Sequence, residues 1–310
     1  MSEPGTDEGP TERGRSPGID DRGPVRRFLA DFFASRTATW ALFFLILIVL
    51  TALFAPWISS QNPYDLARID FRDGRLPPGS VGRTGETYWL GTDDQGRDMV
   101  SAIFYGLRIS LIVGAASGVS ALLLGTVFGI VAAYVGGRTE AAIMRTADIF
   151  FAFPTILIAL VLLAVLGRGL DKVIVALVAK EWSLFARIAH GAARAERERE
   201  YIEAARCLGL SAPRIVFRHL LPNCSPPLLV FFTVNVANAI LLEATLSFLG
   251  VGLPVTEPSL GLLVANGYQY MLSGRYWMSV FPGIALFLTV ACINLVADRC
   301  RDILNPRGLE

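Results

Sequence analysis

Long apolar runs alternate with shorter polar segments along most of this chain. Several of the runs reach the roughly 20 residues that a helix needs to cross the hydrocarbon core of a bilayer. The alternation therefore predicts an all-α polytopic membrane protein with six transmembrane helices. They are expected at residues 37–58, about 101–134, about 141–166, about 171–190, about 226–248 and 276–297, the last five within a core domain of residues 99–298.

Positive charge is distributed unevenly over the polar connections. Arginines precede the first apolar run, and six more lie in the connection 191–223. The positive-inside rule places the N-terminus and this connection in the cytoplasm. The acidic loop 59–98 and the nearly uncharged segment 251–276 are then external, and residues 299–310 form a cytoplasmic C-terminal tail.

The N-terminal segment has a composition of its own. Its first 27 residues are rich in Gly, Pro, Glu, Asp and Arg and contain almost no aliphatic side chains. Such a segment cannot bury enough apolar surface to offset its ordering entropy, so we predict that residues 1–36 form a disordered cytoplasmic tail and the approach to the membrane. The segment is not a cleavable signal peptide, because no early apolar core precedes a small-residue cleavage site.

The connection 191–223, called the bracket below, predicts two helices joined by a turn. Its first half is built from strong helix formers, and Gly209 can end that helix in the left-handed conformation. Ser211 can cap a second short helix with Pro213 in its first turn, and Pro222 is expected to close it. A polar helix pair between apolar spans is suited to docking against another protein.

The bracket also carries a family resemblance. Glu203-Ala204-Ala205, Gly209 and Leu221-Pro222 resemble the EAA loop of bacterial ABC-importer permeases. The longer strings at 198–206 and 218–223 are similar to the C-type permease subunit of dipeptide and oligopeptide importers, although His219 stands where the general pattern has Ile. The resemblance covers residues 37–307 and includes the strings at 88–98, 148–154, 243–250 and 298–307.

This resemblance implies a type I ABC importer permease fold and a transport function. The chain would be a permease subunit of the bacterial inner membrane that forms, with a second homologous permease, the pathway for di- and oligopeptides. An extracytoplasmic binding protein would deliver the cargo, and two ATP-binding subunits would dock on the bracket, a coupling helix loop. The expected coupling residues are Glu203, Ala204, Ala205, Gly209, Leu221 and Pro222.

The chain lacks a nucleotide-binding motif of its own. A phosphate-cradling loop has the form G-x-x-x-x-G-K-[ST], and neither of the two lysines, Lys172 and Lys180, follows a glycine. The chain is therefore not expected to be an enzyme or to hold a cofactor. ATP and Mg²⁺ are expected on the partner subunits.

Polar residues inside the predicted spans are candidates for the translocation path. Asn235 and Asn238 lie three positions apart and so share a helix face, and Glu243 follows in the same span. Either these groups line the path or the amides tie helices together. Lys180 and Glu181 lie in the fourth span, where each charge costs about 3 kcal/mol at mid-bilayer, so this helix should face protein or a watery cavity.

Two further features concern packing and the external loop. Gly114, Gly118, Gly125 and Gly129 in the second span should let neighbouring helices approach closely, and Pro154 should kink the third span. The aspartates of the loop 59–98 have two interpretations. They form a solvated surface with local turn hydrogen bonds, or they contact a substrate-delivering protein.

The same residues allow alternative functions. An ion-gradient-driven secondary transporter would use Lys180, Glu181 and Glu243 as a relay, but this leaves the bracket unexplained. The same importer architecture also serves nickel or glutathione, and a purely structural scaffold does not fit the resemblance.

The net charge of +1 does not indicate nucleic acid as a partner, whereas 53% hydrophobic residues indicate membrane lipid. No disulfide is expected, and the cysteines have no spacing to His190 or His219 that resembles a zinc site.

Overall fold

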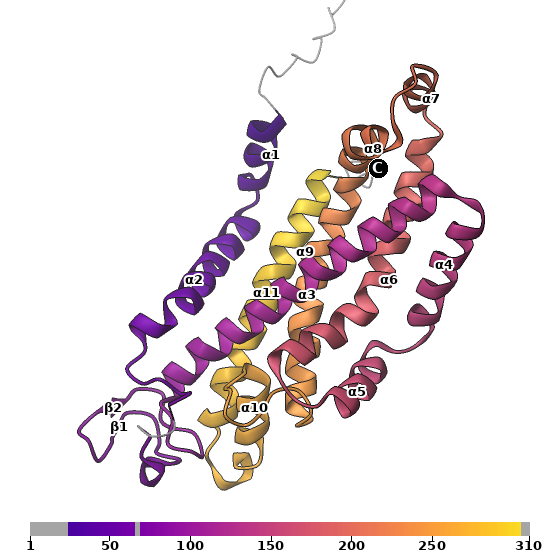
Figure 1. Ribbon diagram of the computed structural model, residues 1–310. Coiled ribbons are helices and arrows are strands. Elements are labelled where there is room, and N and C mark those ends of the chain that lie inside the picture. Colours follow the sequence, from indigo (N-terminus) through magenta and orange to yellow (C-terminus); the bar gives the residue numbers. More distant parts are fainter. Residues whose placement is uncertain (1–23, 66–68, 305–310) are drawn as a thin grey trace, which may run out of the picture.

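The computed structural model describes residues 24–65 and 69–304, and its long helices run between two ends of the molecule (Figure 1). Two strands of the loop 59–98, β1 (Ser80–Val81) and β2 (Thr87–Tyr88), pair antiparallel. The helices are α1 (Pro24–Phe33), α2 (Arg36–Ile58), α3 (Met99–Val135), α4 (Gly137–Ala152), α5 (Thr155–Leu166), α6 (Leu170–Arg197), α7 (Glu200–Cys207), α8 (Ala212–Ile215), α9 (Leu221–Phe248), α10 (Leu260–Tyr268) and α11 (Trp277–Leu304), with short helical turns η2 (Phe71–Asp73), η3 (Val216–Leu220) and η4 (Met271–Ser273).

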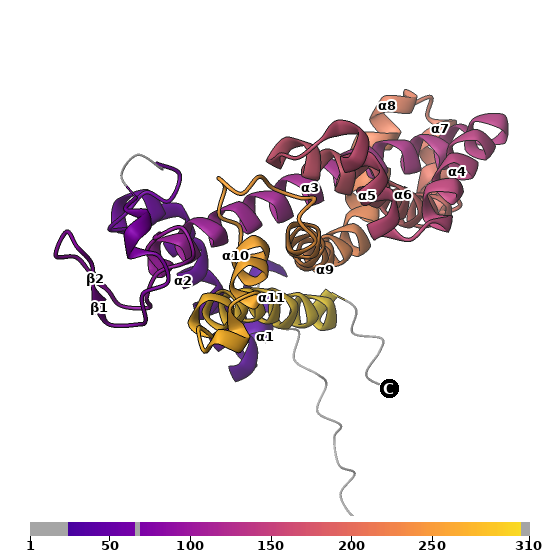
Figure 2. The same cartoon turned by 90° about the horizontal axis from the view of Figure 1, so that it is seen from below.

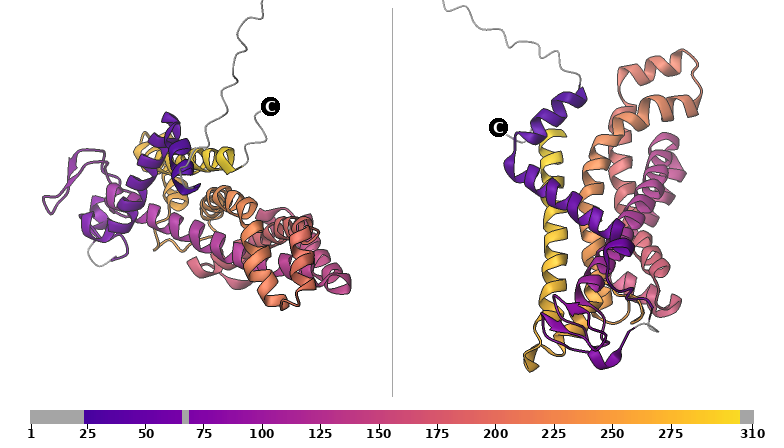
Figure 3. Two further views of the ribbon diagram at one scale, coloured as in Figure 1. Left: turned by 90° about the horizontal axis from the view of Figure 1, so that it is seen from above. Right: turned by 90° about the vertical axis from the view of Figure 1, so that its left-hand side faces the viewer.

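The two ends of the molecule carry different elements. Helices α1, α7 and α8 and the last turns of α11 lie at one end, whereas β1, β2 and α10 lie at the other (Figures 1 and 3). Seen from below, α3 crosses between a group formed by α1, α2 and α11 and a group formed by α4 to α8 (Figure 2). The predicted cytoplasmic segments therefore share one end, and the predicted external segments share the other.

Within the described residues, four helices are long and apolar enough to cross a membrane. They are α2, α3, the rod from α8 to α9 and α11, and the pair α4 and α5 is a candidate for a fifth span. Helix α6, the predicted fourth span, does not qualify by composition because it carries several charged residues. The structure thus supports a multi-pass helical membrane protein.

The predicted third span is broken rather than kinked. Helices α4 and α5 meet at an angle of 92°. Phe153 has extended backbone angles, and Pro154 precedes the first turn of α5. A proline disfavours the helical conformation of the residue before it and supplies no N–H, so the chain leaves the helix here. The predicted position of the bend at Pro154 is confirmed, but the helix is interrupted there and not merely kinked.

The glycines of α3 allow two helices to pack closely against it. A Cβ on Gly114 would lie 2.8 Å from the Ile240 side chain of α9, and Gly118 faces the same helix. A Cβ on Gly125 would lie 2.5 Å from the backbone oxygen of Trp182 in α6, and one on Gly129 would lie 2.4 Å from that of Ala186. The predicted close approach of neighbouring helices is confirmed, and the neighbours are α6 and α9 of this same chain.

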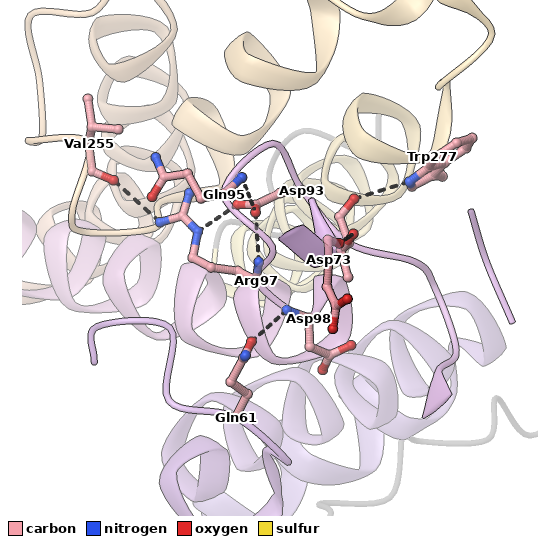
Figure 4. Close-up of polar contacts among 9 residues, drawn as sticks. Gln61, Asp73, Asp93, Gln95, Arg97, Asp98, Val255 and Trp277 are labelled. Carbon is pink, nitrogen blue, oxygen red and sulfur yellow. Dashed lines mark hydrogen bonds and ion pairs between the residues drawn. The ribbon is translucent and has the colours of Figure 1, made fainter. Parts of the chain in front are cut away.

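Residues 59–65 and 69–98 fold into a structure at the start of α3 that is called the clasp below (Figure 4). Arg97 is fully buried, and its Nε donates to Asp93 at 2.6 Å while its Nη1 donates to the carbonyl of Val255 at 3.3 Å. The indole nitrogen of Trp277 donates to the carbonyl of Thr92 at 3.2 Å. These contacts join the loop to the segments on either side of α10.

Several aspartates of this clasp are buried. Asp73, Asp93 and Asp98 are each less than 5% exposed. Asp93 accepts hydrogen bonds from the backbone N–H groups of Gln95 and Arg97, and Asp98 caps α3 by accepting from the N–H of Ser101. The predicted turn hydrogen bonds are confirmed, but the predicted solvated surface was wrong for these three residues, because neighbouring segments cover them.

The boundaries of the two predicted tails also change. The predicted disorder of residues 1–23 lies outside the described residues, but residues 24–33 form α1, whose Phe32 is buried. Arg299 donates to the carbonyl of Asp31, which joins α11 to α1. Helix α11 continues to Leu304, so the predicted tail 299–310 begins as helix, and residues 305–310 lie outside the described part.

Candidate functional site

The first helix of the bracket ends in a complete Schellman motif. The N–H of Gly209 donates to the carbonyl of Arg206 at 2.9 Å, and the N–H of Leu210 donates to that of Ala205 at 3.2 Å. Gly209 has a φ of +70°, which L side chains rarely adopt. A Cβ at this position would meet nothing within 4 Å, so conformation rather than space requires glycine.

The two faces of α7 have different surroundings. Ile202 is fully buried and Ala205 is 5% exposed, and both pack against the ends of α3 and α6 in a cluster with Ile215 and Leu220. Glu203 and Ala204 are exposed. Among the predicted coupling residues of α7, Glu203 and Ala204 are thus accessible to a partner, whereas Ala205 packs α7 against α3 and α6.

An exposed leucine at the end of α7 was missed by the sequence analysis. Leu208 is 79% exposed, and it follows directly after the last turn of the helix. A large apolar side chain at this position gains nothing from the surrounding fold. Because Leu208 lies four positions after Ala204, it extends the exposed face of α7.

The second half of the bracket is continuous with α9. Ser211 precedes α8 and Pro213 lies in its first turn, but the Ser211 side chain makes no capping hydrogen bond. The chain then passes through the π-helical turn η3, in which the N–H of Leu221 donates to the carbonyl of Val216, and enters α9. Pro222 follows this turn, where the shift in hydrogen-bonding pattern accommodates its missing N–H and the helix continues into α9. The prediction that Pro222 closes the helix was therefore wrong.

A polar network holds the two halves of the bracket together. The hydroxyl of Tyr201 in α7 donates to Glu196 at the end of α6, and the side-chain amide of Asn223 in α9 donates to this hydroxyl at 2.8 Å. Partial burial and the hydrogen bond to Glu196 raise the pKa of Tyr201 above its usual value. The network connects three helices at the base of the bracket.

A polar hollow of about 370 Å³ lies beneath α7. Arg197 is one of its lining residues and donates to the carbonyl of Ala133 at 2.6 Å, which satisfies an acceptor in the last turn of α3. Glu140 of α4 forms a 2.8 Å contact with His190 of α6. Three arginines and three glutamates take part in the lining: Arg194, Arg197, Arg206, Glu140, Glu198 and Glu203.

A second hollow of about 480 Å³ opens between α4, α5, α6 and α9. Its lining combines charged, amide, hydroxyl and aromatic groups. Asn238, one of the predicted path residues, is exposed here. The lining includes Phe151, Thr155, Lys180, Glu181, Phe231, Asn238 and Thr245.

The other two predicted path residues have different surroundings. Asn235 is 1% exposed, and its amide nitrogen donates to Glu181 at 2.7 Å, which joins α9 to α6. Glu243 is fully buried and accepts from Ser110 at 3.1 Å and from Ser247 at 2.8 Å. Glu243 therefore lies in a serine pocket between α3 and α9, apart from Asn238.

Within the described part of the chain, no group of three or more histidine, cysteine, aspartate or glutamate side chains is arranged to hold a metal ion. All four cysteines are free thiols: Cys207, Cys224, Cys292 and Cys300. The described residues therefore show no metal site or disulfide at the bracket or at the hollow.

Comparison with known protein families identifies the chain. Residues 125–308 match the family described as "Binding-protein-dependent transport system inner membrane component". The chain belongs to this family. As a binding-protein-dependent transport permease it is a multi-pass inner-membrane subunit, and residues 23–78 also match the "N-terminal TM domain of oligopeptide transport permease C".

Three relatives are similar over most of their length. The chain is 36% identical to the di/tripeptide transport system permease protein DppC of Pseudomonas aeruginosa over 92% of each chain. It is 42% identical to a putative peptide transport system permease protein of Brucella suis over 92% of this chain and 93% of that one. It is also 36% identical to the glutathione transport system permease protein GsiD of Pectobacterium atrosepticum over 92% of each.

Solved structures support the fold. Two inward-facing structures of the MetNI methionine ABC transporter superpose on the chain with TM-scores of 0.53 and 0.54. The identities are 22% and 24%, and the matches cover 65% and 66% of this chain and 96% and 97% of the others. The helical core therefore has the fold of an ABC importer permease, and the predicted resemblance is confirmed.

Proposed function

We propose that this permease is one of two transmembrane subunits of an ATP-driven importer for di- and oligopeptides. The bracket carries the proposal, because it presents Glu203, Ala204 and Leu208 to solvent on a helix that the chain fixes rigidly. The Pseudomonas and Brucella relatives are permeases named for peptide transport systems, which supports peptides as cargo. ATP and Mg²⁺ belong in this proposal to two separate ATPase subunits, and an extracytoplasmic binding protein delivers the peptide.

The proposed topology has six spans, with α6 as the fourth. Its charged residues Lys180 and Glu181 face the hollow between α4, α5 and α9, so the helix can be polar and still cross the bilayer. The end that carries α1 and the bracket is cytoplasmic, in agreement with its arginines. Both termini then lie in the cytoplasm.

The proposed coupling mechanism uses the rigid connections of the bracket. When the ATPase subunits close on ATP, they move α7, and the Schellman turn passes this movement to α8. Because α8, η3 and α9 form one rod, the displacement reaches the wall of the hollow directly. Helix α6 enters the bracket from the other side, and Tyr201 links it to α9.

The proposed path runs along the hollow of α4, α5, α6 and α9 rather than past all three predicted residues. Asn238 lines this hollow, and Asn235 positions Glu181 beside it. Glu243 contributes to helix packing through its two serine donors. The separation of Glu243 from Lys180 and Glu181 also disfavours an ion relay of the kind that a secondary transporter needs.

Reconstitution of the full importer tests this proposal. The chain would be purified together with the second permease subunit, the ATPase subunits and the binding protein of the same importer, and the complex would be placed in proteoliposomes. We expect accumulation of labelled dipeptide that requires ATP and the binding protein and that vanadate inhibits. Accumulation driven by an ion gradient without ATP would contradict the proposal. Uptake of glutathione in preference to dipeptides would replace peptides by glutathione as the proposed cargo, as the name of the Pectobacterium relative indicates.

A further inference from the structure

Two cations of α6 flank one aromatic ring in the hollow. Lys180 Nζ lies 4.8 Å from the centre of the Phe151 ring, and the guanidinium carbon of Arg187 lies 4.7 Å from it. Arg187 also has a carboxylate partner, because its Nη1 lies 2.7 Å from an oxygen of Asp148. Lys180 has no carboxylate within ion-pair distance among the residues that the structure describes.

The position of Lys180 makes this difference important. The residue is 7% exposed and lies ten residues after the start of α6, which is about 15 Å along the helix axis and thus near the middle of a span. An ammonium group at this depth is costly unless it is paired. The ring face of Phe151 offsets part of the cost but carries no net charge.

The neighbouring carboxylate is engaged elsewhere. Glu181 accepts from the amide nitrogen of Asn235 at 2.7 Å and forms no ion pair with Lys180 within 4 Å. The hollow therefore presents one cation that has no carboxylate in direct contact, and the exposed amide of Asn238. It also contains the Glu181 carboxylate, which is hydrogen-bonded to Asn235 and interacts with Lys180 only at longer range. These groups are complementary to a molecule that has a carboxylate, an ammonium group and peptide bonds.

We infer that Lys180 is a cargo-contacting residue of the path and binds the C-terminal carboxylate of a peptide in transit. The inference rests on the proposed function, since it assigns a role to one residue within that pathway. The carboxylate supplies the directly contacting anion that Lys180 lacks in the described structure, so the contact forms while the peptide occupies the hollow and breaks when the helices rearrange. The contact makes this permease sensitive to the charge of the cargo terminus.

Transport of two matched cargoes tests the inference. The reconstituted importer would be assayed with a dipeptide and with its C-terminal amide, each at a concentration that saturates the binding protein, so that the permease step is compared. Lys180→Met should lower uptake of the free acid about tenfold relative to the amide, as expected for the loss of one charge-assisted contact. Lys180→Arg should keep the wild-type ratio, because it retains the positive charge.

Arg187→Met provides the matched control. It also removes a cation from the Phe151 ring, but Arg187 already has Asp148 as its partner, so uptake of both cargoes should change in the same proportion. If Lys180→Met left the ratio of free-acid to amide uptake unchanged, whether or not total uptake fell, the proposed role of Lys180 would be overturned. That result leaves ATP-dependent peptide uptake by the wild type intact, whereas absence of that uptake would reject the proposed function itself.

Discussion

The N–H of Leu210 donates to the carbonyl of Ala205 at 3.2 Å across the turn that ends α7. This bond forms only if Gly209 adopts its positive φ, and it sets the direction in which the chain leaves the exposed face of α7. The turn therefore fixes the geometry of the proposed docking helix relative to the rod of α8 and α9.

Replacement of Gly209 should uncouple transport without preventing membrane insertion. A valine would have to adopt the left-handed conformation at a cost of about 1–2 kcal/mol or more, and the turn would relax to avoid it. We expect Gly209→Val to lose ATP-driven uptake while the protein remains in the membrane fraction. Gly209→Asn is the control, because asparagine tolerates this conformation and nothing lies within 4 Å of its Cβ. Normal uptake by the valine variant would count against the coupling role of the turn.

Leu208 should contribute to binding of the ATPase subunits. Burial of a leucine side chain in an interface is worth about 1.5–3 kcal/mol, so Leu208→Ser should weaken the complex about tenfold or more. The measurement is the affinity of purified ATPase subunits for the detergent-solubilised permease. Leu272→Ser is the matched control, since Leu272 is also highly exposed but lies beyond α10 at the opposite end of the molecule. If the ATPase subunits bound the two variants with equal affinity, Leu208 would not be part of the docking surface.

Local chemistry explains what the sequence predicted well. The helices of the bracket and the stop at Gly209 depend on residues a few positions apart, and the glycine spacing of α3 follows from one helix alone. These predictions needed no knowledge of distant contacts. The family resemblance depended on the same local strings.

Long-range contacts explain what the sequence did not reveal. Arg97 binds a carbonyl 158 positions away, and Glu243 accepts from a serine 133 positions away. The inward direction of Ala205 and the exposure of Leu208 depend on how α7 packs against α3 and α6. Pro222 was read as a stop, yet the preceding π-helical turn lets the helix continue through it. The sequence located the bend at Pro154 but not its size, because the 92° angle between α4 and α5 depends on how both helices pack against α6.

Two glycines on the contacting helices should respond in opposite ways to the same substitution. A Cβ on Gly129 would lie 2.4 Å from the carbonyl oxygen of Ala186, so Gly129→Ala would force α3 and α6 apart and destabilise the protein by about 1–3 kcal/mol. Gly191 lies in α6 with nothing within 4 Å of its Cβ, so Gly191→Ala should stabilise by about 0.5–1 kcal/mol. Thermal unfolding in detergent measures both changes. A similar shift for both variants would mean that the close helix contact does not limit stability.

The clasp at the start of α3 should be more stable when Asp94 loses its charge. Burial raises the pKa of this carboxyl, and the neighbouring charge of Asp93 raises it further. One carboxylate oxygen of Asp94 is buried and has no hydrogen-bond partner in the described structure. Because the folded-state pKa exceeds the unfolded-state value, folding takes up protons between the two values, and stability falls as the pH rises through this window. The ionised group therefore destabilises the clasp at neutral pH.

Asp94→Asn should remove this penalty. We expect the variant to resist proteolysis of the loop 59–98 better than the wild type at pH 7. The advantage should disappear as the pH falls below the window, because the wild-type carboxyl is then neutral as well. Protease sensitivity measured across that range checks the sign directly. A difference that stays constant with pH would show that the substitution acts through packing or hydrogen bonding and not through the charge of Asp94.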